Sequence, residues 1–260
     1  MIRILGLILL LVLSHCTRKT KYIEASNVQL TTPLINSTSL FASKSNKIET
    51  AYMNSSTSLE VIYLDRAENK TYNSKESVVL DQIGTYKLRA INPPFLPSEW
   101  IEIKVLPQGK PIKSIDWISD VSPNYFKGGS AVLNDGKSAD ISFHSNGWTG
   151  SNSPFRLKVK LDAPIAVDSL TLGVLYNPSA WICPRSEVQI TIKDKLAVVQ
   201  KEFDIAVEGN LNEQKHAFVS FDLREKASEI QLDFIPKNLP KEHPGAGTPA
   251  WLFLDELIIY

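Results

Sequence analysis

Two adjacent acidic residues, Asp255 and Glu256, lie in the last apolar segment and are the most suggestive pair for acid–base chemistry. A hydrolase that works with two carboxylates needs them about 5 to 10 Å apart, on either side of the bond that breaks. The apolar residues around the pair predict a β-strand, in which neighbouring side chains point to opposite faces. We therefore do not expect the pair to flank one substrate bond, and we predict no catalytic residue in it.

Other chemistry-bearing residues are few. Cys183 lies in an apolar run and is predicted to be a buried structural thiol, because a nucleophilic thiolate needs a nearby histidine or helix amino terminus. Two cysteines and four histidines are too few for a zinc cluster or a disulfide framework. The chain has no phosphate-binding glycine loop, no His-Glu-x-x-His zinc motif and no nucleophile elbow. These observations favour a protein that is not an enzyme.

Apolar residues alternate with polar ones along most of the chain, which is typical of half-buried β-strands. The clearest runs are 59–63, 86–90, 101–105, 155–161, 170–174, 188–192, 230–234 and 251–259. No segment has a convincing helical period. The sequence therefore predicts an all-β protein, built as sandwiches or a jelly roll with long end loops.

A segment rich in proline and glycine, 106–111 (LPQGKP), divides the strand patterns into two groups. Proline and glycine interrupt a sheet, so this segment predicts a linker between domains. We expect a small amino-terminal β-sandwich over 28–107 and a larger β-sandwich over 112–260. Binding residues in such folds lie on the loops at the ends of the strands.

The first 27 residues predict export. Arg3 precedes the apolar run 4–13, which has the length of a signal-peptide core and about half that of a membrane span. The run ends in 13–16 (LSHC), which resembles a bacterial lipobox, although His15 stands where a small residue is usual. We expect 1–15 to be a lipoprotein signal peptide, Cys16 to carry the lipid and 16–27 to be a polar tether. The alternatives are a plain signal peptide, or a disulfide between Cys16 and Cys183 that would exclude the lipid.

The charge balance excludes one class of partner. Lysine plus arginine and aspartate plus glutamate both number 28, so the formal net charge is zero. No basic excess is available to displace counterions from nucleic acid, and we do not expect nucleic-acid binding. The membrane contact we expect is the lipid anchor alone, in a bacterial periplasmic or cell-surface lipoprotein.

Five phrases in the second region together resemble one family. They are LNDG at 133–136, NGWTG at 146–150, SAWICPRSEV at 179–188, HPGAG at 243–247 and AWLFLDE at 250–256. In this order they resemble the discoidin-like (coagulation factor 5/8 type C-like) domain at the carboxyl end of bacterial β-N-acetylhexosaminidases. Residues 28–107 are similar, more weakly, to the immunoglobulin-like module that precedes it in those enzymes. The resemblance implies an immunoglobulin-like β-sandwich followed by a discoidin-like jelly roll.

The resemblance also bears on cofactor and activity. The catalytic barrel of those enzymes needs about 250 further residues, for which this chain has no room, so no glycosidase activity is implied. Discoidin-like modules often hold a structural calcium ion between an Asp-Gly loop and a glutamate near the last strand. Asp135 and Glu256 match these two positions, and Ser138 or Asp140 would help complete the shell. The alternative is an ordinary Asp-Gly turn beside a partly exposed acid, with no cofactor at all.

The carbohydrate-binding relatives of this domain direct attention to loop aromatics, because sugars stack on aromatic faces and bind polar side chains through their hydroxyls. Trp148 lies between glycines, with His144 and Asn146 just before it on the same loop. Arg185 and His243 are two further candidates for ligand contact. The competing interpretation makes Trp148 a plug of the sandwich end, Arg185 a surface ion-pair partner and His243 a clamp of its loop.

Three other aromatic residues have the same two interpretations. Tyr125 and Phe126 precede a glycine pair and could form an exposed platform, although a hydrophobic plug is favoured. Trp181 lies in a strand-like apolar run and is predicted to be in the core. We thus expect a non-catalytic surface lipoprotein that binds carbohydrate, accessory to glycan capture or degradation. The alternative is a structural or protein-interaction module without sugar affinity, whose partner is a glycan-processing protein.

Overall fold

The computed structural model describes residues 25–37, 39–43, 47–51, 56–73, 76–119, 125–126, 129–195 and 197–260. Within these ranges the chain consists of antiparallel β-strands joined by loops and short 3-10 turns, which confirms the predicted all-β class. None of the helices in these ranges has the length and hydropathy of a membrane span. The predicted signal peptide, Cys16 and the tether up to residue 24 lie outside the described residues.

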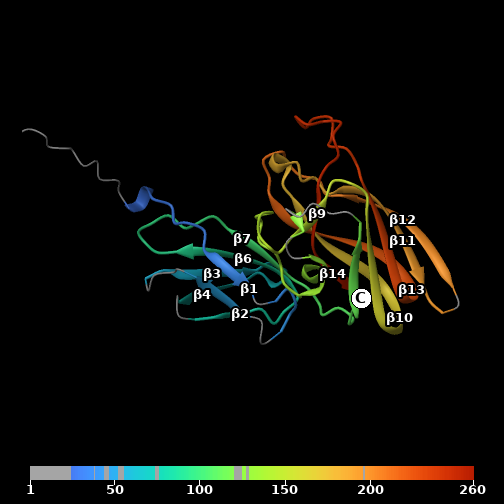
Figure 1. Cartoon of the computed structure of the whole chain (residues 1–260). Coiled ribbons are helices and arrows are strands. Elements are labelled where there is room, and N and C mark those ends of the chain that lie inside the picture. Colours follow the sequence, from blue (N-terminus) through green and yellow to red (C-terminus); the bar gives the residue numbers. More distant parts are fainter. Residues whose placement is uncertain are drawn as a thin grey trace, which may run out of the picture.

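Two small sheets form the amino-terminal part of the chain (Figure 1). One has the strand order β1 (Leu34–Ser37), β2 (Lys47–Ala51) and β5 (Val78–Val79). The other has the order β4 (Glu68–Asn73), β3 (Ser58–Tyr63), β6 (Gly84–Ile91) and β7 (Ile101–Val105). Alternate residues of β3 and β6 share one core with residues of β5 and β7 and with Leu80; its members are Leu59, Val61, Val78, Leu80, Tyr86, Leu88 and Val105. The period-two pattern at 59–63, 86–90 and 101–105 thus corresponds to strands of the four-stranded sheet, and the immunoglobulin-like sandwich over 28–107 stays a prediction.

Seven strands form one large sheet in the carboxyl-terminal part. Its path is β12 (Val198–Ala206), β11 (Arg185–Lys193), β13 (Lys215–Pro236), β10 (Phe155–Tyr176), β14 (Leu252–Ile259) and β9 (Thr149–Ser151), and β8 (Ser114–Ile118) pairs with β10. The 3-10 turns η4 (Gly129–Asn134) and η5 (Pro178–Ala180) lie in the loops. The main core takes buried residues from both halves of β10 and β13 and from β11, β12 and β14.

The two longest strands bend this sheet over its own core. We predicted separate strands at 155–161 and 170–174, but both belong to the 22-residue strand β10. Its pairing with β13 shifts register after Lys160 and again after Val167, and such irregularities bend and twist a ribbon. Phe203 of β12 therefore lies 5.0 Å from Phe221 in the distant half of β13, between ring centroids. Folding the sheet in this way places its loops at two ends.

The segment predicted as a linker lies against β14. The Lys110 N–H donates to the Ile259 carbonyl at 2.7 Å, and a Cβ on Gly109 would come within 2.5 Å of Ile258. Leu106 packs with Leu40 and Ile258 in one buried cluster. This cluster joins the amino-terminal strands to the large sheet, so the two parts share an apolar contact.

Candidate functional site

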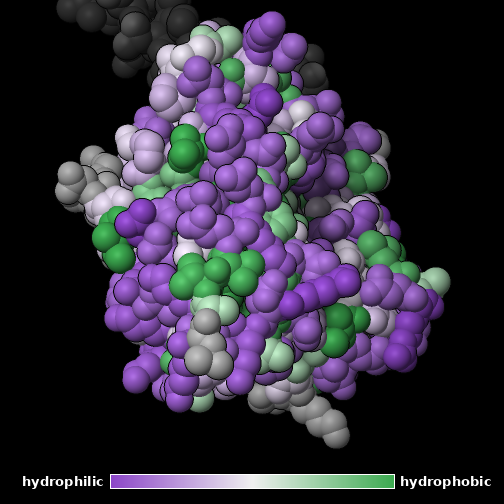
Figure 2. Space-filling view, turned by 90° about the vertical axis from the view of Figure 1, so that its right-hand side faces the viewer, coloured by the Kyte–Doolittle hydropathy of each residue, from purple (hydrophilic) through white to green (hydrophobic). Residues whose placement is uncertain are grey.

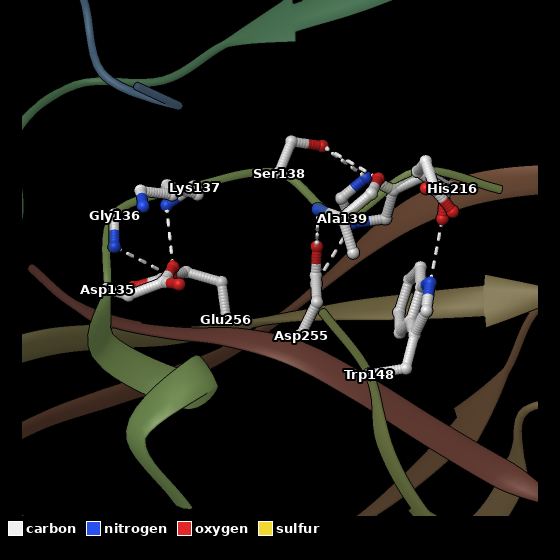
Figure 3. Close-up of polar contacts among 10 residues, drawn as sticks. Asp135, Gly136, Lys137, Ser138, Ala139, Trp148, His216, Asp255 and Glu256 are labelled. Atoms are coloured by element: carbon white, nitrogen blue, oxygen red, sulfur yellow. Dashed lines mark hydrogen bonds and ion pairs between the residues drawn. The ribbon is translucent and has the colours of Figure 1, made fainter. Parts of the chain in front are cut away.

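The last strand presents both of its acids to one loop. Gly173 of β10 pairs with Glu256, whereas its neighbour Val174 pairs with Leu254, so Asp255 is an extra residue at a bulge. Glu256 Oε2 accepts the Gly136 N–H at 3.0 Å, and Asp255 Oδ2 accepts the Ala139 N–H at 3.0 Å (Figure 3). The expectation that the two side chains point to opposite faces is therefore wrong, because it assumed a regular strand. Both are 1% exposed.

A histidine on a third element completes this cluster. His216, at the start of β13, lies with Nε2 3.1 Å from Asp255 Oδ1 and Nδ1 2.9 Å from Ser138 Oγ. Its ring meets the edge of Trp148 at 5.4 Å and lies 4.5 Å from the ring of Phe218, between centroids. The hydrogen bonds run from the 135–139 loop through β13 to β14 (Figure 3). A cavity of about 220 Å³ beside the loop is partly lined by Ser138.

Burial dominates the electrostatics of the acids. Burial first, and then the nearby carboxylates of Asp135 and Asp255, raise the pKa of Glu256 to about 8, against the lowering effect of the loop amides. Burial also raises the pKa of Asp135, while the Lys137 N–H, which donates to Asp135 Oδ1 at 2.9 Å, lowers it. Glu256 is therefore mostly protonated in the folded protein at neutral pH.

These residues do not fit the expected calcium ion. Calcium takes six to eight oxygen ligands. The carboxylates of Asp135, Asp255 and Glu256 instead accept backbone N–H groups, whose positive ends oppose a cation. Within the described ranges, no three acidic, histidine or cysteine side chains are grouped so that they could hold a metal. Asp135 and Glu256 match the family's calcium-binding positions in sequence, but their surroundings do not fit a calcium ion.

The hydrogen-bond chain also differs from a nucleophilic triad in one respect. Ser138, His216 and Asp255 follow one another as a nucleophile, base and orienting acid would. Acyl transfer also needs amide donors for the developing oxyanion, and the amide after the nucleophile often serves. Here that amide, of Ala139, donates to Asp255. This series of hydrogen bonds is therefore suited to positioning the loop.

The predicted ligand residue Trp148 is part of the core. It is 1% exposed, packs with Leu175, Ile182 and Phe253, and donates from Nε1 to the Asp140 carbonyl at 2.7 Å. A buried ring cannot offer its face to a sugar, so the interpretation of Trp148 as a plug fits this placement and ligand contact does not.

The other candidates of this loop lie at its surface. His144 and Asn146 are exposed, and the His144 ring lies 3.9 Å from the ring of Phe143, between centroids. Phe143 in turn lies near Tyr125, whose ring contacts Trp251 at 4.6 Å. The rings of Tyr125, Phe143 and Trp251 are half-buried, so they form a plug with a partly open rim.

Trp181 is the exposed aromatic residue that the sequence placed in the core. It is 44% exposed, because η5 ends there and the chain turns through a left-handed conformation with φ of 65°. Its N–H donates to the Pro178 carbonyl at 2.8 Å, and its ring stands over Gly245, where a Cβ would lie 3.1 Å away. The prediction that Trp181 lies in the core is wrong, because a pattern of apolar residues typical of a strand cannot reveal a turn of this kind.

His243 holds the support beneath this tryptophan. Its Nε2 lies 2.8 Å from the Pro178 carbonyl, and its Nδ1 accepts the Gly245 N–H at 3.0 Å, which defines a neutral ring with the proton on Nε2. At 5% exposure, His243 acts as the clamp of its loop, and direct ligand contact does not fit this burial. Arg185 is half-buried at the start of β11.

Cys183 lies beside this region and is buried, as expected. Burial raises the pKa of its thiol, which suits a structural role. The lipidation site Cys16 lies outside the described residues. Sequence reasoning missed His216 and Gly173, which belong to no motif, and it considered Ser138 only as a ligand of calcium. The isolated glycine in an apolar strand is the one signal of a close approach.

Comparisons with solved structures return several matches of low sequence identity. A carbohydrate-binding module from Clostridium perfringens, in complex with GlcNAc-α-1,4-galactose, is 16% identical, with 56% of this chain and 88% of that chain covered and a TM-score of 0.33. The C-terminal domain of a chitobiase from Bacteroides fragilis is 13% identical, with 58% and 91% covered and a TM-score of 0.34. A pectin-binding module is 14% identical, with 58% and 91% covered and a TM-score of 0.36.

No family model matches the sequence, and no curated protein matches it. The structural matches are modules of the discoidin-like kind that the sequence resembles. Because their TM-scores lie below 0.5, no functional residue is carried over from them to this chain.

Proposed function

We propose that this chain is a non-catalytic, exported lipoprotein that binds a glycan through the loop end carrying Trp181. The observation that supports this is the exposed Trp181 ring on a fixed support, built by the left-handed turn, Gly245 and the clamp His243. A sugar can place its C–H face on such a ring. A platform fixed in advance loses little freedom on binding, which favours affinity.

Polar groups must supply specificity beside an aromatic platform. His144, Asn146 and Arg185 keep exposed or half-exposed positions and stay candidates for this role. Trp148 and His243 are left out because they are buried. Through a lipid on Cys16, the module would hold glycan at a bacterial membrane, at the periplasmic or outer face, for a glycan-processing partner.

The alternative is a structural or protein-interaction module without sugar affinity. It predicts an exposed apolar patch larger than a few hundred Å². On the face seen in Figure 2, hydrophobic side chains occur in small separate groups among hydrophilic ones. That face therefore does not favour the alternative.

The first experiment compares the wild type with Trp181→Ala and Trp181→Phe on a glycan array, using residues 17–260. We expect binding of a defined glycan, a loss of affinity of about tenfold in Trp181→Ala, and most of the affinity retained in Trp181→Phe, which keeps a ring for stacking. Far-ultraviolet circular dichroism confirms that both variants are folded. If the wild type binds no glycan, or Trp181→Ala binds as well as the wild type, the proposed site is wrong.

A further inference from the structure

The loop at 135–139 is held from two sides, and the Gly136 carbonyl within it is engaged away from the acids. The Gly136 carbonyl accepts the Leu40 N–H at 2.7 Å, on the side of the amino-terminal strands. Gly136 has φ of +70°, and a Cβ there would lie 3.2 Å from the ring of Phe41, so glycine suits this contact. At the far end, the Asp140 carbonyl accepts Trp148 Nε1 at 2.7 Å. These two oxygens are committed to protein donors.

The opposite side of the loop presents amide groups to the sheet. The Gly136 and Ala139 N–H groups each donate at 3.0 Å, to Glu256 and Asp255. Backbone N–H groups that donate to acid side chains occupy the oxygen atoms that a cation would need free. The loop thus has the polarity that suits a carboxyl group in place of a metal ion.

His216 ties the same loop to the middle of the sheet. Its ring forms hydrogen bonds with Ser138 on the loop and Asp255 on β14. Strand β10 leaves room for the contact between His216 and Asp255 because residue 173 is glycine. The side chain of His216 is 13% exposed and that of Asp255 is 1% exposed, so water competes little for these hydrogen bonds.

We infer that the 135–139 loop is pinned by this hydrogen-bond network, with His216 as the link between loop and sheet, and that the chain needs no calcium to order it. Glu256, Asp255 and His216 hold the loop from the sheet, and Leu40 and Phe41 hold it from the amino-terminal strands. The network does the task that a structural metal ion performs elsewhere, and it also supports the contact between the two parts of the chain.

The test uses residues 17–260 stripped with EDTA, with calcium chloride as the probe. We expect no binding heat in calorimetric titration with calcium, and melting temperatures in 5 mM calcium and 5 mM EDTA that agree within about 1 °C. Hydrogen exchange followed by NMR should find the Gly136 and Ala139 amides protected in EDTA, because both donate to buried acids.

Two variants test the link itself. His216→Gln should lower the melting temperature by more than about 5 °C, because it leaves Asp255 buried with a weaker partner, and calcium should not restore it. Should His216→Gln fail to fold, Ser138→Ala removes only the hydroxyl group at the loop end and should speed exchange of the Ala139 amide. His144→Gln, an exposed histidine on the following loop, is the matched control and should change neither quantity.

Three outcomes would overturn the inference. Calcium binding that raises the melting temperature would assign the loop to a metal. Unprotected Gly136 and Ala139 amides in EDTA would exclude the hydrogen bonds. A His216→Gln variant as stable as the wild type, or an Ala139 amide that exchanges no faster in Ser138→Ala, would remove His216 as the link.

Discussion

Gly173→Ala will destabilise this protein by about 3 kcal/mol or more, although alanine is otherwise preferred to glycine within a strand. Gly173 lies on β10 between β13 and β14. A Cβ at this position would lie 2.0 Å from Asp255 Oδ1 and 2.8 Å from His216 Nε2. Neither group can move freely, since Asp255 also holds the Ala139 amide. The methyl group therefore separates the pair and leaves a buried carboxylate without its partner, which is costly.

Thermal unfolding measures this effect, with an expected decrease in melting temperature of roughly 6 to 12 °C. Ala166→Gly, at an exposed position of the same strand, gives the cost of the backbone change without the contact. The sharper control repeats Gly173→Ala in an Asp255→Ala background, where the obstructed oxygen is absent and the substitution should cost much less. An equal cost in both backgrounds would show that Asp255 is not what the methyl group meets.

The sequence predicted the fold class because strand periodicity is a local property. The alternation of apolar residues at 59–63, 86–90 and 188–192 corresponds to β3, β6 and β11. The same local signal could not reveal that 155–161 and 170–174 form one strand, because the intervening residues pair irregularly with β13. Pairing partners, and not periodicity, decide where a strand ends.

The candidate site was less predictable, for two physical reasons. A bulge at Asp255 changes which way a side chain points, and it depends on register with β10. A left-handed turn exposes Trp181, although its neighbours Ile182 and Cys183 are buried. The first feature arises from strand pairing and the second from the end of a short 3-10 turn, so an alternating pattern places Asp255 and Trp181 wrongly. Trp148 fitted both interpretations from sequence, and its burial decided between them.

Glu256 gives the second large effect, a loss of stability as the pH rises. Its pKa is raised from 4.5 to about 8 in the folded protein, chiefly by burial. The folded state therefore holds a proton that the unfolded state releases, so the contribution of Glu256 to stability is full below pH 4.5 and is lost as the pH rises to about 8. Raising the pH from 5 to 8 therefore removes on the order of 4 kcal/mol from the free energy of unfolding.

Glu256→Gln isolates this contribution, because glutamine is neutral at every pH and can still accept the Gly136 N–H. Urea unfolding at several pH values should give a wild-type curve that falls toward pH 8 more steeply than that of the variant. Glu242→Gln, at an exposed position, should keep the wild-type slope. Parallel curves for the wild type and Glu256→Gln would mean that Glu256 is ionised in the folded state, as a bound cation would make it. The pH profile therefore tests the metal-free network through the energetics of one side chain, independently of any added calcium.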